Sequence, residues 1–81
     1  MEEATTQEMT FGEKVVGKTF NPSGDDKVAR LKQLAAEMVD IVEQDYSKKP
    51  ITPIGDILFQ QAVGEILNGQ MNAVKFVTNK Y

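Results

Sequence analysis

The sequence predicts an all-α protein in which a short N-terminal helical arm precedes two long antiparallel helices. Apolar residues recur every three or four positions between Val28 and Val42, the spacing of one helix face. A second apolar stretch follows Pro53, and residues that commonly start helices precede both stretches. Because the chain has only 81 residues, we expect a single domain over residues 10–81, after a flexible N-terminus at residues 1–9.

The N-terminal arm is expected to be a short helix over residues 10–17. Thr10 and Glu13 have the spacing of a capping box, in which each side chain accepts a hydrogen bond from the other residue's backbone N–H. Gly17 follows two valines and is the residue type that most often ends a helix. The arm should therefore make about two helical turns.

The first long helix is predicted over residues 23–46. Asn21 or Ser23 can cap it, because both side chains accept hydrogen bonds from free backbone N–H groups. Asp25 and Asp26 then fall in the first turn, where negative charge complements the helix dipole.

The second long helix is predicted over residues 53–79. Thr52 should cap it, Pro53 suits the first helical position, and Asp56 is expected to complete a capping box. The pair Asn68-Gly69 is a strong turn signal, so the helix either ends there or continues with a penalty of about 1 kcal/mol for the glycine. We favour one continuous helix because the apolar phase carries across the pair, at Ile66, Gln70, Ala73 and Val77.

The second long helix carries more apolar residues than one helix partner can cover. Phe59, Val63 and Phe76 lie off its main apolar stripe. Such residues are expected to pack against other copies of the chain, so we predict a compact closed homo-oligomer.

Composition argues against an enzyme. The chain has no histidine and no cysteine, so it lacks the usual proton-transfer residue, the usual transition-metal ligands and any base to activate a serine or threonine. Glu37 and Asp40, or Asp40 and Glu43, lie one helical turn apart and could share a hard metal ion, but a solvated acidic face is the better explanation. We therefore predict a binding or structural protein without cofactor or metal.

The charge and the N-terminal sequence indicate where the protein works. Nine basic and twelve acidic residues give a net charge of −3, which disfavours binding to long nucleic acids. No apolar run reaches membrane-spanning length, and the polar, acidic N-terminus resembles neither a signal peptide nor a transit peptide. We expect a cytoplasmic protein that does not bind membranes.

The stretch GKTFNPSGDDKVARLK, residues 17–32, has the features of an anion site. A helix N-terminus offers free backbone N–H groups, cations surround it, and Phe20 can stack on a purine. The candidate ligand-binding residues are Lys18, Phe20, Asn21, Ser23, Gly24, Lys27, Arg30 and Lys32. The alternative is a capped helix with a buried Phe20 and solvated lysines, and Asp25 and Asp26 would repel an anion there. The residues alone leave both readings open.

Two stretches, TFNPSGDDKVARLKQLAAEMVDIV and GQMNAVKFVTNK, resemble a known family. They are similar to the small phage proteins that defeat CBASS immunity by sequestering its cyclic-nucleotide messengers, the second anti-CBASS family described. The shared features are an Asn-Pro-Ser-like lead-in, a lysine near RLK in an amphipathic helix, and a C-terminal signature close to QMNAVKFVT. The resemblance covers about residues 18–79.

The resemblance implies an all-helical homohexamer that holds its ligand without cleaving it. Family members bind cyclic dinucleotides in pockets between protomers, and some bind cyclic trinucleotides in separate pockets. By position, the family's phosphate-binding lysine falls on Lys32. The family's base-stacking aromatic falls on Phe20, although the spacing to Lys32 is shorter than usual, with Phe11 as a second candidate. A phenylalanine also lacks the hydroxyl of the tyrosine seen elsewhere in the family.

Two other functions are compatible with the residues. The apolar helix faces suit a helical adaptor that binds a protein partner and has no small-molecule ligand. A minor nucleic-acid regulator would use the basic residues between Lys27 and Lys32. The negative net charge of the chain argues against this function. The preferred cyclic nucleotide, and the existence of a second pocket, do not follow from the sequence.

Overall fold

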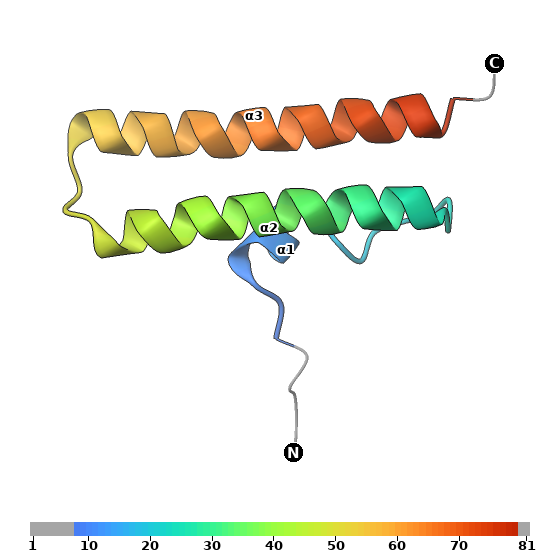
Figure 1. Ribbon diagram of the computed structural model, residues 1–81, viewed down its shortest axis with the longest axis horizontal. Helices are drawn as coiled ribbons and strands as arrows, with labels where there is room; N and C mark the ends of the chain where they lie inside the picture. The colour runs from blue at the N-terminus through green and yellow to red at the C-terminus, as the bar shows by residue number, and fades with distance from the viewer. Residues whose placement is uncertain (1–7, 80–81) are drawn as a thin grey trace.

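The computed structural model describes residues 8–79 and confirms the all-α fold. Three helices follow in order: α1 over Phe11–Val16, α2 over Asp26–Lys48 and α3 over Pro53–Val77. Figure 1 shows α2 and α3 side by side and antiparallel, with the short α1 packed against α2. α1 also reaches α3, where Phe11 lies near Phe59 and Val16 packs with Ile66 and Leu67. The Cα atoms extend only 13 Å along the shortest axis, so the helices form a flat layer.

α1 has the predicted capping box and the predicted glycine end. The Thr10 hydroxyl accepts from the Glu13 N–H, and the Glu13 carboxylate accepts from the Thr10 N–H, each at 3.1 Å. Gly17 has φ of 65°, in the left-handed region where only glycine is unstrained, and its N–H donates back to the last turn. The first residues of the predicted flexible segment, 1–7, lie outside the described residues.

α2 begins later than predicted, and the predicted cap is wrong. Asp25 is the N-cap, and its carboxylate accepts from the Lys27 N–H at 2.7 Å. Asn21 and Ser23 instead bond to each other, with the Ser23 hydroxyl donating to the Asn21 side chain at 2.7 Å. Gly24, at φ of 65°, then turns the chain into the helix. The helix also runs two residues beyond the predicted end, to Lys48.

α3 is continuous through Asn68-Gly69, as the apolar phase predicted. Thr52 is the N-cap and its hydroxyl accepts from the Gly55 N–H at 2.9 Å. The predicted capping box with Asp56 is wrong, because Asp56 lies one residue too far along the chain and accepts from the Tyr46 hydroxyl at 2.9 Å instead. The helix ends at Val77, two residues short of the prediction.

The core is small and built from short side chains. Val16, Ala35 and Ala36 are buried together, with Ile66 and Leu67 packed against them. α1 lies so close to α2 that a Cβ on Gly12 would overlap the carbonyl oxygen of Ala36. The Gly12 N–H donates to the Asp40 carboxylate at 2.7 Å, which fixes α1 across α2.

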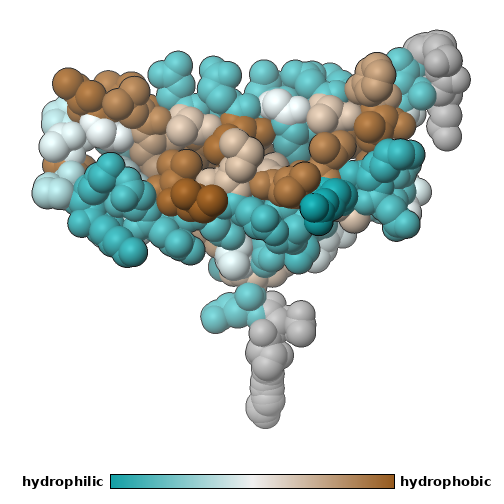
Figure 2. Space-filling model, viewed as in Figure 1, coloured by the Kyte–Doolittle hydropathy of each residue, from teal (hydrophilic) through white to brown (hydrophobic). Residues whose placement is uncertain are grey.

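Large apolar side chains are exposed on both long helices. Figure 2 shows hydrophobic side chains gathered along the seam between α2 and α3 and toward the hairpin turn. The exposed large apolar residues of α2 are Leu34, Met38 and Ile41, and those of α3 and the turn are Ile51, Ile54, Ile57, Leu58, Met71 and Phe76. Within the described residues, no helix is long and apolar enough to cross a membrane.

Candidate ligand-binding groove

A groove of about 470 Å³ lies where the connector after α1 meets α2 and the C-terminal half of α3. This volume is within the range of about 300–1,000 Å³ that is usual for small-molecule sites. Its aromatic and polar lining residues are Phe20, Lys32, Gln70 and Lys75, and its apolar lining residues are Val15, Val16, Leu67, Met71 and Val74. The groove therefore combines an apolar floor with two cations, an amide and one aromatic ring.

Lys32 is buried and holds the connector in place. Only 8% of the residue is exposed. Its ammonium donates to the Gly17 carbonyl at 3.1 Å and to the Phe20 carbonyl at 2.5 Å. These bonds offset the cost of burying the charge and satisfy carbonyl groups that follow the end of α1. In this structure, the predicted phosphate-binding lysine thus has a positioning role on Phe20.

Phe20 is the most exposed large apolar side chain of the groove. It is 71% exposed, so the alternative prediction of a buried Phe20 is wrong. The Lys32 ammonium lies 5.4 Å from the centre of its ring, within cation–π range. Because Lys32 fixes the Phe20 backbone and the ring is exposed to solvent, a flat base can stack on the Phe20 ring.

The lead-in residues satisfy each other instead of forming an open cradle. The Gly24 N–H donates to the Asn21 carbonyl at 3.1 Å, and the Asp25 N–H donates to the Ser23 hydroxyl at 3.1 Å. The Lys27 N–H is taken by the Asp25 carboxylate. Asn21, Ser23 and Gly24 shape the turn after Phe20, and none of them lines the groove.

The structure separates the predicted cations into different surroundings. Lys18 pairs with Glu13 at 3.1 Å. The pKa of the Glu13 carboxyl is lowered by the hydrogen bond from the Thr10 backbone and then by Lys18. Lys27 and Arg30 are exposed on α2, outside the groove lining. Of the predicted cations, only Lys32 lines the groove.

Sequence reasoning missed Lys75 and Gln70. Both lie in the stretch that resembles the family's C-terminal signature. That resemblance was the feature of the sequence from which they could have been predicted as site residues. Lys75 is exposed at the groove and can supply a second cation. Gln70 is only 8% exposed, and its side-chain amide makes no hydrogen bond within residues 8–79. A buried amide without a partner costs about 1–3 kcal/mol, so it calls for an explanation.

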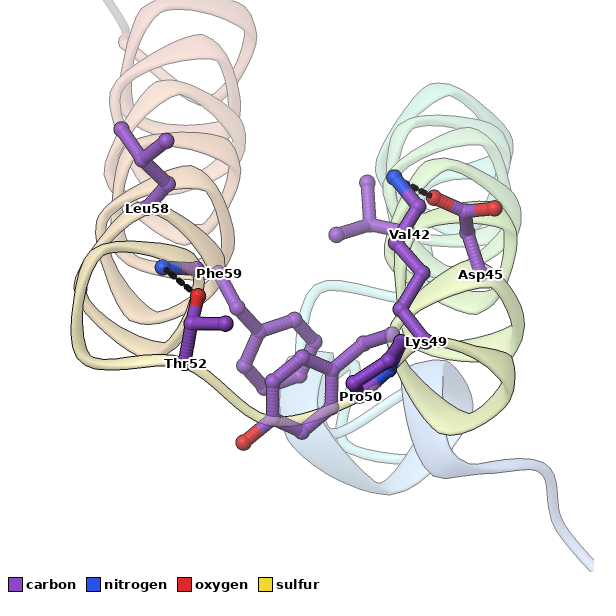
Figure 3. A pocket seen from close by; sticks show the side chains of 9 residues that line it. Val42, Asp45, Lys49, Pro50, Thr52, Leu58 and Phe59 are labelled. Atoms are coloured by element: carbon purple, nitrogen blue, oxygen red, sulfur yellow. Dashed lines mark hydrogen bonds and ion pairs between the residues drawn. The ribbon is translucent and has the colours of Figure 1, made fainter.

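A second hollow at the hairpin turn has its polar groups already paired (Figure 3). Tyr46 and Phe59 stack across it with ring centres 4.0 Å apart. The Lys49 ammonium pairs with the Asp45 carboxylate at 2.6 Å. The hydrogen bond to Asp56 raises the pKa of the Tyr46 hydroxyl. This hollow, of about 240 Å³, therefore closes the hairpin and offers little to a ligand.

Three further findings concern the second stacking candidate, metal binding and similarity to known proteins. Phe11, the second candidate for base stacking, lies 6.4 Å from the Phe59 ring, away from the groove. Among the residues that the structure describes, no group of three or more acidic side chains is placed to hold a metal ion. Comparison of the chain with protein-family models, with curated proteins and with solved structures found no match.

Proposed function

We propose that the protein binds cyclic dinucleotides in the groove, without cleaving them, and so withholds these messengers from CBASS immune signalling in the cytoplasm of a phage-infected host. The observation that carries the proposal is the meeting of two distant segments. Phe20 and Lys32 come from one stretch that resembles the anti-CBASS family, Gln70 and Lys75 come from the other, and all four line one groove. Cyclic trinucleotides are further candidate ligands on the same resemblance.

The chemistry of the lining residues suits such a ligand. A cyclic dinucleotide carries two negative charges and two flat bases. Phe20 offers an exposed face for a base, and Lys75 offers an exposed ammonium for a phosphate. The negative charge of the whole protein does not oppose this, because a few local cations are enough for a small anion.

Assembly of several copies completes the proposal. The exposed apolar residues of α2 and α3 make a surface that is unusual for a monomer. We propose a closed homo-oligomer, a hexamer by the resemblance, in which neighbouring grooves share one ligand across a two-fold axis. Charged hydrogen bonds of about 1.5–3 kcal/mol and base stacks of about 1–3 kcal/mol, each present twice, can reach about −12 kcal/mol, or nanomolar affinity, in a preorganised site.

Calorimetric titration with a panel of cyclic di- and trinucleotides tests the proposal. We expect tight binding by the wild type and at least about tenfold weaker binding by Phe20→Ala, since the base stack is lost. Phe11→Ala is the control and should keep the wild-type affinity, because Phe11 is a partly exposed phenylalanine of α1 that lies by Phe59 and does not line the groove. Absence of binding to every member of the panel would refute the proposal.

Two companion measurements complete the test. Native mass spectrometry with the ligand mixture reports the copy number and the number of bound ligands together. Recovery of intact ligand after proteolysis of the complex separates sequestration from cleavage. A monomer at working concentration would contradict the shared-pocket arrangement.

A helical adaptor is the second candidate function, favoured by the apolar cluster at the hairpin turn. Ile51, Ile54, Ile57 and Leu58 are all exposed there. The adaptor hypothesis expects no affinity for any cyclic nucleotide and loss of a protein partner when Ile54 and Leu58 are replaced by serine. The titration above therefore distinguishes the two functions directly.

A further inference from the structure

We propose that the Gln70 side-chain amide recognises the edge of a base that is stacked on Phe20, and that it favours adenine. The inference rests on the proposed function, because it names the base for the same groove. It starts from an unusual residue, a glutamine 8% exposed in the C-terminal half of α3 whose amide has no hydrogen-bond partner within residues 8–79. In a ligand-binding groove, an unsatisfied buried amide is available to the ligand.

An amide suits a base better than it suits a phosphate. It presents one acceptor oxygen and two donor hydrogens side by side, whereas a phosphate oxygen only accepts. Lys75, an exposed cation at the groove, already matches negative charge on the ligand. The amide is therefore the groove's polar group with both donor and acceptor capacity, which recognition of a base edge requires.

The pairing chemistry selects among the bases. The side chain of a glutamine bonds adenine in a two-pronged manner, accepting from the N6 amino group and donating to N7. Guanine has an acceptor, O6, where adenine has the N6 donor, so the amide oxygen would face another oxygen. A well-formed bidentate contact discriminates between bases by about tenfold or more.

The position of Gln70 agrees with this role. It lines the groove together with Phe20 and Lys32. Lys32 fixes the Phe20 backbone, so the ring cannot move freely relative to α3. A base stacked on the Phe20 ring would therefore present one defined edge to α3. A hydrogen bond discriminates between bases only when donor and acceptor are held in fixed positions.

The experiment compares cyclic di-AMP with cyclic di-GMP, using the full chain in its assembled state. We expect the wild type to bind cyclic di-AMP at least about tenfold more tightly than cyclic di-GMP. Gln70→Met, which keeps the side chain's length without its amide, should bind both ligands with similar affinity. Gln61→Met removes an exposed amide elsewhere on α3 and should leave the preference unchanged.

A ligand-side test needs no variant. The 7-deaza analogue of cyclic di-AMP lacks the N7 acceptor, so the wild type should bind it about fivefold to tenfold more weakly than cyclic di-AMP. Equal affinity for the two would overturn the inference, as would an unchanged preference in Gln70→Met. A lower copy number of Gln70→Met in native mass spectrometry would also overturn it, since the amide would then serve a contact between subunits.

The outcomes separate this inference from the proposed function. Tight binding of every ligand with no preference for adenine overturns the role of Gln70 and leaves sequestration standing. Binding of none of the ligands by the wild type overturns both.

Discussion

Replacing Lys32 with methionine removes the charge that holds the connector between α1 and α2. The substitution keeps most of the apolar stem and deletes two hydrogen bonds, to the carbonyls of Gly17 and Phe20. Two charged hydrogen bonds would amount to about 3–6 kcal/mol in full. The expected loss in the free energy of unfolding is smaller than this sum, because both carbonyls have other hydrogen-bond partners available.

The Gly17 carbonyl keeps a second partner, because it also accepts from the Phe20 N–H at 2.9 Å. The Phe20 residue is exposed, so water can reach its carbonyl once the ammonium is gone. Removing a buried charge also recovers part of its desolvation cost. We therefore expect a loss of about 2 kcal/mol in the free energy of unfolding, roughly one charged hydrogen bond. For a chain of this size that corresponds to a fall in Tm of about 8–16 °C.

Thermal unfolding followed by far-UV circular dichroism measures this effect. All samples need the same protomer concentration, because the stability of an oligomer depends on it. Lys27→Met is the matched control, an exposed lysine on the same helix whose loss should change stability by less than about 0.5 kcal/mol. A Lys32→Met variant that melts with the wild type would refute the positioning role.

Ligand binding by the same variant adds a second readout. Because Phe20 loses its support, Lys32→Met should bind a cyclic dinucleotide at least about tenfold more weakly than the wild type. Weaker binding together with unchanged Tm would mean that Lys32 acts on the phosphate and not on the connector, against the reasoning above.

Two further predictions concern the packing of α1 and the hairpin turn. Gly12→Ala should lower the free energy of unfolding by about 1–3 kcal/mol, since the new Cβ overlaps the Ala36 carbonyl. Gly64→Ala should raise it by about 0.5–1 kcal/mol, because there is open space around Gly64 and alanine favours the helix. The urea midpoints of the two variants, each compared with the wild type, measure both effects. The hydrogen bond to Asp56 raises the pKa of Tyr46 and favours the neutral hydroxyl, so its contribution is complete below the ordinary pKa of 10.0 and is lost as the pH rises through the raised value. The difference in urea midpoint between the wild type and Tyr46→Phe should accordingly stay constant up to about pH 10 and shrink above it, and a difference that widens there would contradict this assignment.

Local signals in the sequence determined most of the fold. Thr10 with Glu13, Gly17 and Thr52 mark helix ends through side-chain and backbone bonds that span only a few residues, so the sequence contains all the partners. The continuity of α3 across Asn68-Gly69 followed from the apolar phase on both sides. The N-cap of α2 was predicted wrongly because Asn21, Ser23 and Asp25 are all residue types that suit an N-cap. The left-handed backbone at Gly24 places the turn just before Asp25, which makes Asp25 the cap.

The groove was only partly visible in the sequence. Phe20 and Lys32 were predicted as site residues because an aromatic ring and a cation near the start of a helix suit a nucleotide ligand. Their arrangement depends on tertiary contacts, since Lys32 meets carbonyls twelve and fifteen residues earlier in the chain. Whether a lysine reaches solvent or a carbonyl is set by how closely the connector packs on α2, which local patterns do not encode.

What the sequence determined by itself is the helical content, the helix caps at Thr10, Gly17 and Thr52, and an excess of apolar surface, because these depend on neighbours within one or two turns. Only the tertiary structure decided that Gln70 and Lys75 join Phe20 and Lys32 in one groove. The two pairs are separated by 38 to 55 positions in the sequence. The register of α3 against α2 brings them together, and that register results from packing across the whole hairpin.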